Sequence, residues 1–160
     1  MALGRQAELR PRRIVSGGQT GVDRAALDVA LALGIECGGW CPRGRRAEDG
    51  PIPERYPLRE TASRRYEERT EANVRDSDAT LVLTRGVPTG GTALTCELAR
   101  RYARPCMVVD LAVEVSLAEL RRWLDTSSIE VLNVAGPRES GAPGIHAEAT
   151  ALLQRLLAVR

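Results

Sequence analysis

Two glycine-rich segments are the parts of this chain best suited to chemistry. Residues 17–21 read Gly-Gly-Gln-Thr-Gly and residues 86–92 read Gly-Val-Pro-Thr-Gly-Gly-Thr, and each follows a short apolar segment. Glycine lets a backbone approach a ligand closely, and a helix that begins directly after such a loop directs free N–H groups and a partial positive charge at an anion. The two segments therefore predict a phosphate-like ligand, although each could also be only a tight turn.

Polar and charged side chains near these segments extend the candidate site. Asp23 lies in the first turn of the first predicted helix, where a carboxylate would cap free N–H groups or bond to a ligand hydroxyl or amine. Arginines in the next loop could grip a phosphate or pair with nearby acids: Arg43, Arg45 and Arg46 against Glu48 and Asp49. A polar stripe on a later helix indicates a ligand or a subunit contact: Tyr66, Arg69, Thr70 and Asn73.

Strands and helices alternate around these loops. Strands are expected at 13–16, 35–40, 79–84, 105–110 and 129–134, and helices at 21–34, 63–77, 93–103, 117–124 and 144–159. This alternation predicts an α/β, Rossmann-like, doubly wound and mostly parallel sheet of about five strands flanked by helices. Ligands of such sheets bind at the carboxyl ends of the strands, so both glycine segments are expected to face one cleft.

The 160 residues are enough for one domain of ordinary size. We expect a flexible N-terminal arm at residues 1–12 and a single Rossmann-like ligand-binding domain at residues 13–160. Residues 41–58 contain four prolines and no periodicity, which predicts an ordered loop or lid. The sequence has no uninterrupted apolar run of 18 residues and no apolar core of signal-peptide length, so we expect a cytoplasmic protein that does not enter a membrane.

Composition excludes several kinds of chemistry. All 23 basic residues are arginine, so a Schiff-base lysine and a Walker-type phosphate lysine are absent. One histidine, His146, leaves little for a zinc site or a Ser/His/Asp triad, and we interpret it as a surface or capping residue. The balance of 23 basic against 21 acidic residues argues against nucleic-acid binding. The four cysteines, at 37, 41, 96 and 106, lack the paired close spacing of a metal site and are interpreted as reduced structural thiols, and no metal ligands are predicted.

Several segments resemble the molybdenum carrier family. They include Ile-Val-Ser-Gly-Gly-Gln-Thr-Gly-Val-Asp at 14–23, Gly-Gly-Trp-Cys-Pro-Arg-Gly-Arg at 38–45 and Gly-Gly-Thr at 90–92. The resemblance runs from about residue 13 to 110 and continues more weakly to the end. The family is similar to a wider Rossmann-like group that includes the cytokinin-activating phosphoribohydrolases, also called lysine-decarboxylase-like proteins.

This resemblance implies a small cytoplasmic binding protein, commonly a homo-oligomer, for the molybdenum cofactor, a pterin that bears a phosphate and a metal dithiolene. Any molybdenum would arrive on the cofactor's own sulfurs. We expect the phosphate on the N–H groups of residues 18–21, a lid at 43–49, and a subunit face formed by Tyr102, Trp123 and the terminal helix. The expected ligand-binding residues are Gly17, Gly18, Gln19, Thr20, Gly21, Asp23, Arg43, Arg45, Arg69, Asn73, Thr89, Gly90, Gly91 and Thr92.

The chain departs from the hydrolases that it resembles. They use a Pro-Gly-Gly-x-Gly-Thr-x-x-Glu pattern, whose glutamate position falls here on Thr95, while Glu97 lies on another face of the predicted helix. This departure favours binding over hydrolysis. Two alternatives stay open: an N-glycosidic hydrolase of nucleoside monophosphates with Asp23 or Glu97 as the acid/base, and a sensor of a nucleotide-derived ligand without turnover.

Overall fold

A computed structural model describes residues 10–158 and contains a central sheet of five parallel strands. Their spatial order is β2-β1-β9-β7-β8, and all four neighbouring pairs run parallel. The strands are β1 (Arg13–Val15), β2 (Glu36–Gly38), β7 (Ala79–Thr84), β8 (Cys106–Asp110) and β9 (Val131–Ala135). The predicted Rossmann-like α/β sheet of about five strands is therefore confirmed.

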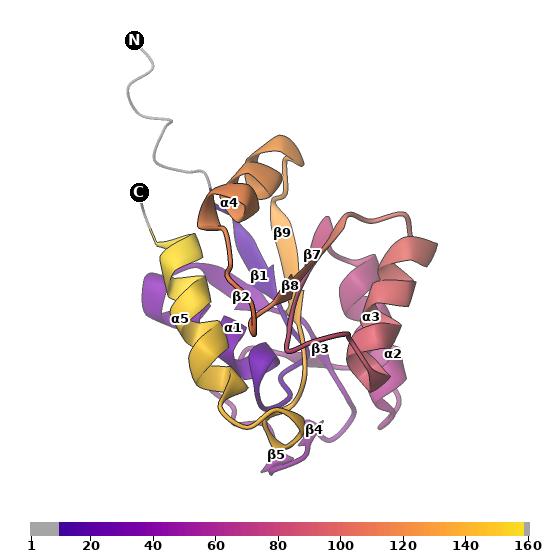
Figure 1. Cartoon of the computed structure of the whole chain (residues 1–160). Helices are drawn as coiled ribbons and strands as arrows, with labels where there is room; N and C mark the ends of the chain where they lie inside the picture. The colour runs from indigo at the N-terminus through magenta and orange to yellow at the C-terminus, as the bar shows by residue number, and fades with distance from the viewer. Residues whose placement is uncertain (1–9, 159–160) are drawn as a thin grey trace.

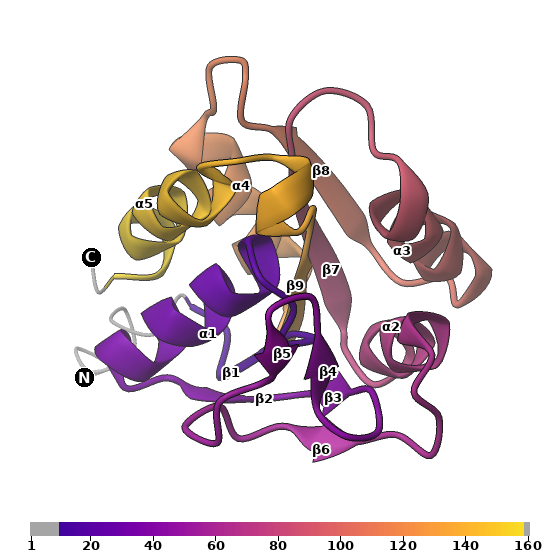
Figure 2. The ribbon, with the colours of Figure 1, turned by 90° about the horizontal axis from the view of Figure 1, so that it is seen from below.

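Five α-helices cover the two faces of this sheet. They are α1 (Val22–Leu33), α2 (Tyr66–Arg75), α3 (Gly90–Arg101), α4 (Leu117–Thr126) and α5 (Ile145–Leu157). Helices α1, α4 and α5 lie on one face and α2 and α3 on the other, as Figures 1 and 2 show from two directions. Because the connections between strands cover both faces, the sheet is doubly wound, and its strand ends are left free to form a site.

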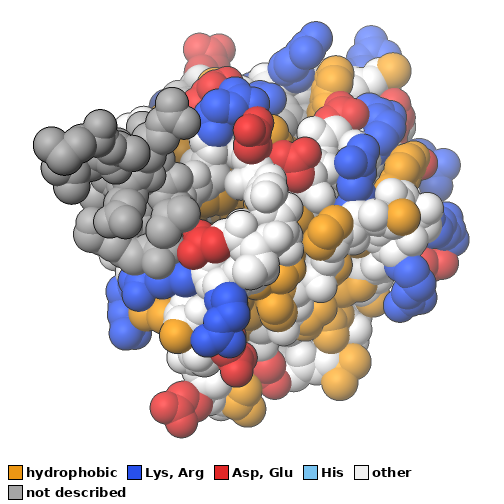
Figure 3. Space-filling model, turned by 90° about the horizontal axis from the view of Figure 1, so that it is seen from above, with side chains coloured by type: hydrophobic (Ala, Val, Ile, Leu, Met, Phe, Trp, Pro, Cys, Tyr) orange, Lys and Arg blue, Asp and Glu red, His pale blue; other side chains and the backbone are white. Residues whose placement is uncertain are grey.

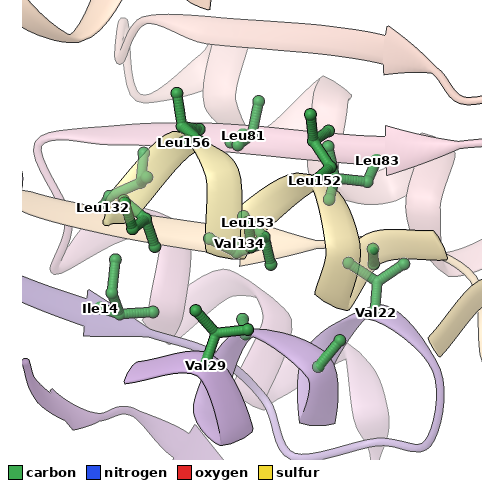
Figure 4. Packing of buried hydrophobic residues seen from close by; sticks show 14 of the residues in the cluster. Ile14, Val22, Val29, Leu81, Leu83, Leu132, Val134, Leu152, Leu153 and Leu156 are labelled. Carbon is green, nitrogen blue, oxygen red and sulfur yellow. The ribbon is translucent and has the colours of Figure 1, made fainter. Parts of the chain in front are cut away.

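The main hydrophobic core lies between the sheet and the α1, α4 and α5 layer (Figure 4). It is built from aliphatic side chains, among them Ile14, Val22, Val29, Leu81, Leu83, Leu132, Val134, Leu152, Leu153 and Leu156. The apolar side of α5 is therefore buried in this core, and the partly buried Trp123 packs against it. Burial of these apolar groups within the domain already removes them from water, so α5 offers less apolar surface than the sequence indicated, and the expected subunit face stays a prediction.

The chain between β2 and α2 contains short strands that the sequence did not predict. They are β3 (Trp40–Cys41), β4 (Arg46–Ala47), β5 (Gly50–Pro51) and β6 (Arg59–Glu60). β3 pairs in parallel with β6, and β4 and β5 form an antiparallel hairpin. The expected strand at 35–40 is interrupted at Gly39, whose φ of 127° is open to few other residues.

Some element boundaries also differ from expectation. Helix α2 is shorter than the predicted 63–77, and α3 begins at Gly90 rather than at residue 93, because glycines at the start of a helix need not form a separate turn. Residues 1–9, most of the predicted arm, lie outside the described residues. Of the remainder, Arg10 donates to the Leu157 carbonyl at 3.3 Å and Pro11 is buried.

The order of the strands places three loops at one edge of the sheet. β9 is the last strand in the chain, yet it lies between β1 and β7. Its carboxyl end, followed by a short 3-10 helix at Glu139–Gly141, therefore lies between the two glycine-rich segments. Figure 2 looks at this end of the sheet.

The opposite end of the molecule carries a mixture of charges. Basic and acidic side chains are interspersed over this face (Figure 3), and Arg12 lies 3.6 Å from Glu36 and 3.9 Å from Glu130. Surface pairs of this kind contribute little to stability, but they leave no wide field of one sign on this face. Among residues 10–158, no helix is long and apolar enough to cross a membrane.

Candidate functional site

A cavity of about 510 Å³ opens at the carboxyl ends of β1, β9 and β7. Its walls come from the loops after these strands and from α2 and α3. The expected site residues that line it are Gly17, Gln19, Asp23, Arg69, Asn73, Thr89, Gly90, Gly91 and Thr92. Five others do not line it: Gly18, Thr20, Gly21, Arg43 and Arg45. The two glycine-rich segments therefore contribute unequally to one cavity.

In the first glycine loop, residues 17–21, the three central N–H groups have acceptors within the loop or in the residues that flank it. The Gly18 N–H donates to Ser16 Oγ at 3.4 Å, the Gln19 N–H to Asp23 Oδ2 at 3.2 Å and the Thr20 N–H to Gln19 Oε1 at 3.1 Å. An N–H group that already has an acceptor gains little from a phosphate. Three of the four expected donors are therefore occupied, which disfavours a phosphate on residues 18–21, and that site stays a prediction.

The glycines of this loop admit neighbouring parts of the protein. A Cβ on Gly18 would lie 2.5 Å from Leu58 Cδ1, and one on Gly21 would lie 2.4 Å from the Pro137 carbonyl oxygen. A Cβ on Gly17 would lie 2.5 Å from Nη1 of Arg69, which donates to the Gly17 carbonyl at 2.6 Å. Close approach is the physical role of these residues, and the approaching groups are protein atoms.

The expected lid is fastened to the domain by hydrogen bonds. Glu48 accepts from the hydroxyl of Thr20 and, at 2.5 Å, from that of Ser140. Arg24 forms a two-pronged pair with Asp49, with Nη2 2.7 Å from Oδ1. The carboxylates of this loop thus bind residues outside it, and not the loop arginines with which they were expected to pair.

Arg43 and Arg45, two of the expected ligand arginines, lie outside the cavity lining. Arg45 donates to four backbone carbonyls, those of Ile52, Pro53, Tyr56 and Leu58, at 2.8 to 3.3 Å. Its guanidinium therefore organises residues 52–58. Arg43 is exposed and lies outside the cavity lining. A guanidinium with five donors suits the unpaired carbonyls of an irregular loop, which gives Arg45 a structural role, while a ligand contact of Arg43 stays a prediction.

The second glycine loop, residues 86–92, leaves its N–H groups open to the cavity. The N–H groups of Thr92 and Ala93 donate to the Thr89 carbonyl, which is the start of α3. Those of Gly90 and Gly91 have no acceptor within residues 10–158. A Cβ on either glycine would meet no atom within 4 Å. This end of α3 therefore offers two free donors and the positive end of a helix dipole.

Asp23 and Arg69 form the charged floor of the cavity. Asp23 is 6% exposed and Arg69 is 8% exposed. Burial raises the pKa of Asp23 to about 6, against the opposing effects of Arg69 and of the Gln19 N–H. Burial likewise lowers the pKa of Arg69. A carboxyl group that titrates near neutrality can exchange a proton with a ligand, and it also caps the first glycine loop.

A third loop, which the sequence analysis did not identify, completes the cavity. Residues 136–138 follow β9 and contribute backbone and the Arg138 side chain. A Cβ on Gly136 would lie 2.2 Å from the Leu83 carbonyl oxygen, so only glycine fits there. The sequence signal that could have identified this loop is the pair Gly136-Pro137, which comes shortly after the predicted strand at 129–134. Further lining residues outside the expected set include Tyr66, Thr70, Thr84, Arg85, Thr95 and Asn133.

The second catalytic candidate lies outside the cavity. Glu97 is exposed and pairs with Arg101 at 2.6 Å on the surface of α3. Thr95 lines the cavity, and its hydroxyl donates to the Gly91 carbonyl at 3.0 Å. A threonine that back-bonds along its own helix has no acidic proton to give. Of the two acid/base candidates, only Asp23 lies at the site.

Metal-binding groups do not gather in the described part of the chain. No three histidine, cysteine, aspartate or glutamate side chains within residues 10–158 could jointly hold a metal ion. All four cysteines are free, and none of them lines the cavity. The one histidine, His146, lies 2.9 Å from Asp28, outside the cavity.

Comparisons with known proteins relate the chain to one family. The model of the circularly permuted YpsA SLOG family matches residues 14–157. A crystal structure of a protein named "putative molybdenum carrier protein", from Syntrophus aciditrophicus SB, shares 45% sequence identity with a TM-score of 0.89. The match covers 92% of this chain and 96% of that one. No curated protein matches the sequence.

Proposed function

Because the chain belongs to the circularly permuted YpsA SLOG family, we propose that it is a binding protein for a phosphorylated small molecule. The observation that carries this proposal is the open N-terminus of α3. Gly90 and Gly91 present N–H groups without acceptors among the described residues, and no atom lies within 4 Å of a Cβ built on either. A helix N-terminus with free donors at a cavity favours a phosphate.

The cavity also suits the rest of such a ligand. Its volume of about 510 Å³ lies in the range of small-molecule sites. Asp23 and Asn133 supply acceptor oxygens for hydroxyl or amine groups, and Thr92 supplies a hydroxyl. The phosphate would therefore lie at α3, with a polar ring or sugar toward the floor of the cavity.

The molybdenum cofactor is the specific ligand that we propose. The similarity to a protein named as a molybdenum carrier supports it, and so does the donor set. The phosphate of the pterin would lie on Gly90 and Gly91, and the ring would contact Asp23. No cysteine lines the cavity, so the cofactor's own sulfurs would hold the metal. The chemistry supplied by the bound cofactor would be that of its metal dithiolene.

The test is to purify the protein without oxygen, denature it and analyse the released small molecules by mass spectrometry together with the molybdenum content. A pterin with stoichiometric molybdenum is the expected result. A nucleotide without molybdenum would contradict the cofactor and would favour the nucleotide sensor. The variant Gly91→Leu should release no ligand and yet remain folded, because the added side chain would extend into open space. If Gly91→Leu releases as much ligand as wild type, the ligand does not bind at the N-terminus of α3.

Asp23 favours a second candidate function, the hydrolysis of an N-glycosidic bond in a nucleoside monophosphate. Its pKa of about 6 and its place in the cavity are those of a general acid. Free base should then appear when the protein is incubated with a nucleoside monophosphate, and the rate should fall at least a hundredfold in Asp23→Asn. A nucleotide that binds and stays intact in both proteins would exclude this function.

A further inference from the structure

Three arginines converge on one tyrosine at the wall of the cavity. The guanidinium carbons of Arg46, Arg69 and Arg138 lie 4.4, 5.2 and 5.4 Å from the centre of the Tyr66 ring. They come from β4, from α2 and from the loop after β9, which are far apart in the sequence. We call these four residues the tyrosine-arginine cluster. Tyr66, Arg69 and Arg138 line the cavity.

The positive charge of this cluster is not neutralised by direct ion pairs among the described residues, although Asp23 and Glu48 attract its arginines from a greater distance. Among residues 10–158, no carboxylate lies within 4.0 Å of the guanidinium of Arg46, Arg69 or Arg138. Arginines elsewhere on the molecule do have such partners: Arg24, Arg75, Arg85 and Arg101. The tyrosine-arginine cluster therefore gathers three guanidinium groups around one ring with no carboxylate in direct contact with any of them.

The nearby acids are engaged in other contacts. Asp23 accepts from the Gln19 N–H, and Glu48 accepts from Thr20 and Ser140. The tyrosine ring attracts a cation through its electron-rich face, but it carries no net charge. Three guanidinium groups around one ring repel each other, and Arg69 is also buried. An arrangement of this kind is stabilised when an anion occupies the space between the guanidinium groups.

We propose that the tyrosine-arginine cluster is a second oxyanion subsite of the cavity. The inference rests on the proposed function, in which the first phosphate lies on Gly90 and Gly91 of the second glycine loop. Both subsites line the same cavity, so a single ligand can reach them. The ligand then belongs to the class of small molecules that carry one phosphoryl group and a second oxyanionic group at a separate position. Guanidinium groups suit phosphoryl oxygens, which they bind in a two-pronged way.

Equilibrium dialysis against radiolabelled inorganic phosphate tests this assignment on the full chain. Wild type is expected to bind two phosphates per chain. Arg138→Gln and Arg46→Gln should each weaken one of the two sites at least tenfold, and because both side chains are exposed, the fold should be kept. Arg59→Gln is the matched control, since Arg59 is also exposed and lies 4.8 Å from the Trp40 ring, outside the cavity. It should still bind two phosphates.

The outcomes separate this inference from the proposed function. One phosphate in wild type, lost in Gly91→Leu and kept in Arg138→Gln, would overturn the second subsite and leave the first. One phosphate, lost in Arg138→Gln and kept in Gly91→Leu, would overturn the first and leave the second. No binding would overturn both. Crystals soaked in tungstate should show anomalous peaks at both places, and a peak beside α3 alone would again contradict the second subsite.

A thermal readout distinguishes a binding role from a structural one. Without phosphate, Arg138→Gln should melt at the temperature of wild type or slightly above it, because one of three repelling charges is removed. In excess phosphate, wild type should gain more in melting temperature than the variant. The opposite result would be a variant that melts at a lower temperature than wild type without phosphate and whose melting temperature rises as much as that of wild type when phosphate is added. It would show that Arg138 stabilises the fold and does not bind the anion.

Discussion

The first glycine loop (residues 17–21) and the second (residues 86–92) follow strands of the same sheet and face the same cavity, yet they differ in what surrounds them. In the first, the N–H groups of Gly18, Gln19 and Thr20 all have acceptors within the protein. In the second, those of Gly90 and Gly91 have none in the part of the chain that the structure describes. Glycine in a loop thus indicates that something approaches the backbone, and only the fold decides whether protein or ligand does so.

The largest expected effect comes from adding one methyl group to each loop. Gly21→Ala should lower the free energy of unfolding by about 2 to 4 kcal/mol, because Gly21 has a φ of 82° and its Cβ would lie 2.4 Å from the Pro137 carbonyl oxygen. Gly91→Ala should leave it unchanged or raise it by up to about 1 kcal/mol, because the space is open and alanine favours a helix. Urea unfolding measures both. An equal loss of unfolding free energy in the two variants would contradict the difference between the two glycine loops.

The titration of Asp23 should appear in the stability of the protein. Its pKa is about 6 in the folded chain and 3.8 in the unfolded reference, so between these values the folded protein binds more protons. The free energy of unfolding should therefore fall as the pH rises from 4 to 6. The wild-type value minus that of Asp23→Asn should fall by up to about 3 kcal/mol over this range.

Chemical denaturation at pH 4, 5, 6 and 7 gives this difference directly, since the other titrating groups are common to both proteins. A difference that rises with pH would mean that Asp23 is stabilised as an anion by its neighbours, and the first glycine loop would then be less buried than it is here.

Arg43 and Arg45 allow the same comparison within the lid, because the sequence predicted a ligand contact for both and the structure gives them different surroundings. Arg45→Ala should cost about 2 kcal/mol of stability, since its guanidinium donates to four backbone carbonyls. Arg43→Ala should cost less than about 0.5 kcal/mol, because the side chain is exposed. Thermal melts of both variants give the answer, and a greater loss in Arg43→Ala would reverse these assignments.

The smallest effect is expected at Glu97, which belongs to the helix of the second glycine loop but not to the cavity. Glu97→Gln breaks an exposed pair with Arg101, which contributes about 0.3 to 0.5 kcal/mol. Phosphate binding measured by dialysis should stay within twofold of wild type. A loss of binding would place Glu97 in the site after all.

The sequence predicted the fold better than it predicted the site. The strands and helices follow from local apolar patterns, and the residues on α2 that line the cavity were visible as a polar stripe on one helix face. The third loop was missed because nothing local shows that β9 lies between β1 and β7. The insertion of the last strand is a long-range pairing, and it is what brings Arg138 to Tyr66.

By itself, the sequence determined the α/β class, the succession of elements and the residue types available, because these depend on patterns within about twenty residues. It also placed two glycine-rich segments at strand ends. What covers the first glycine loop was decided by tertiary structure, since Leu58, Arg69 and the Pro137 carbonyl approach its glycines, whereas nothing in the described part of the chain approaches Gly90 or Gly91. A hydrogen-bond donor is free or satisfied according to what the folded chain brings within about 3 Å of it.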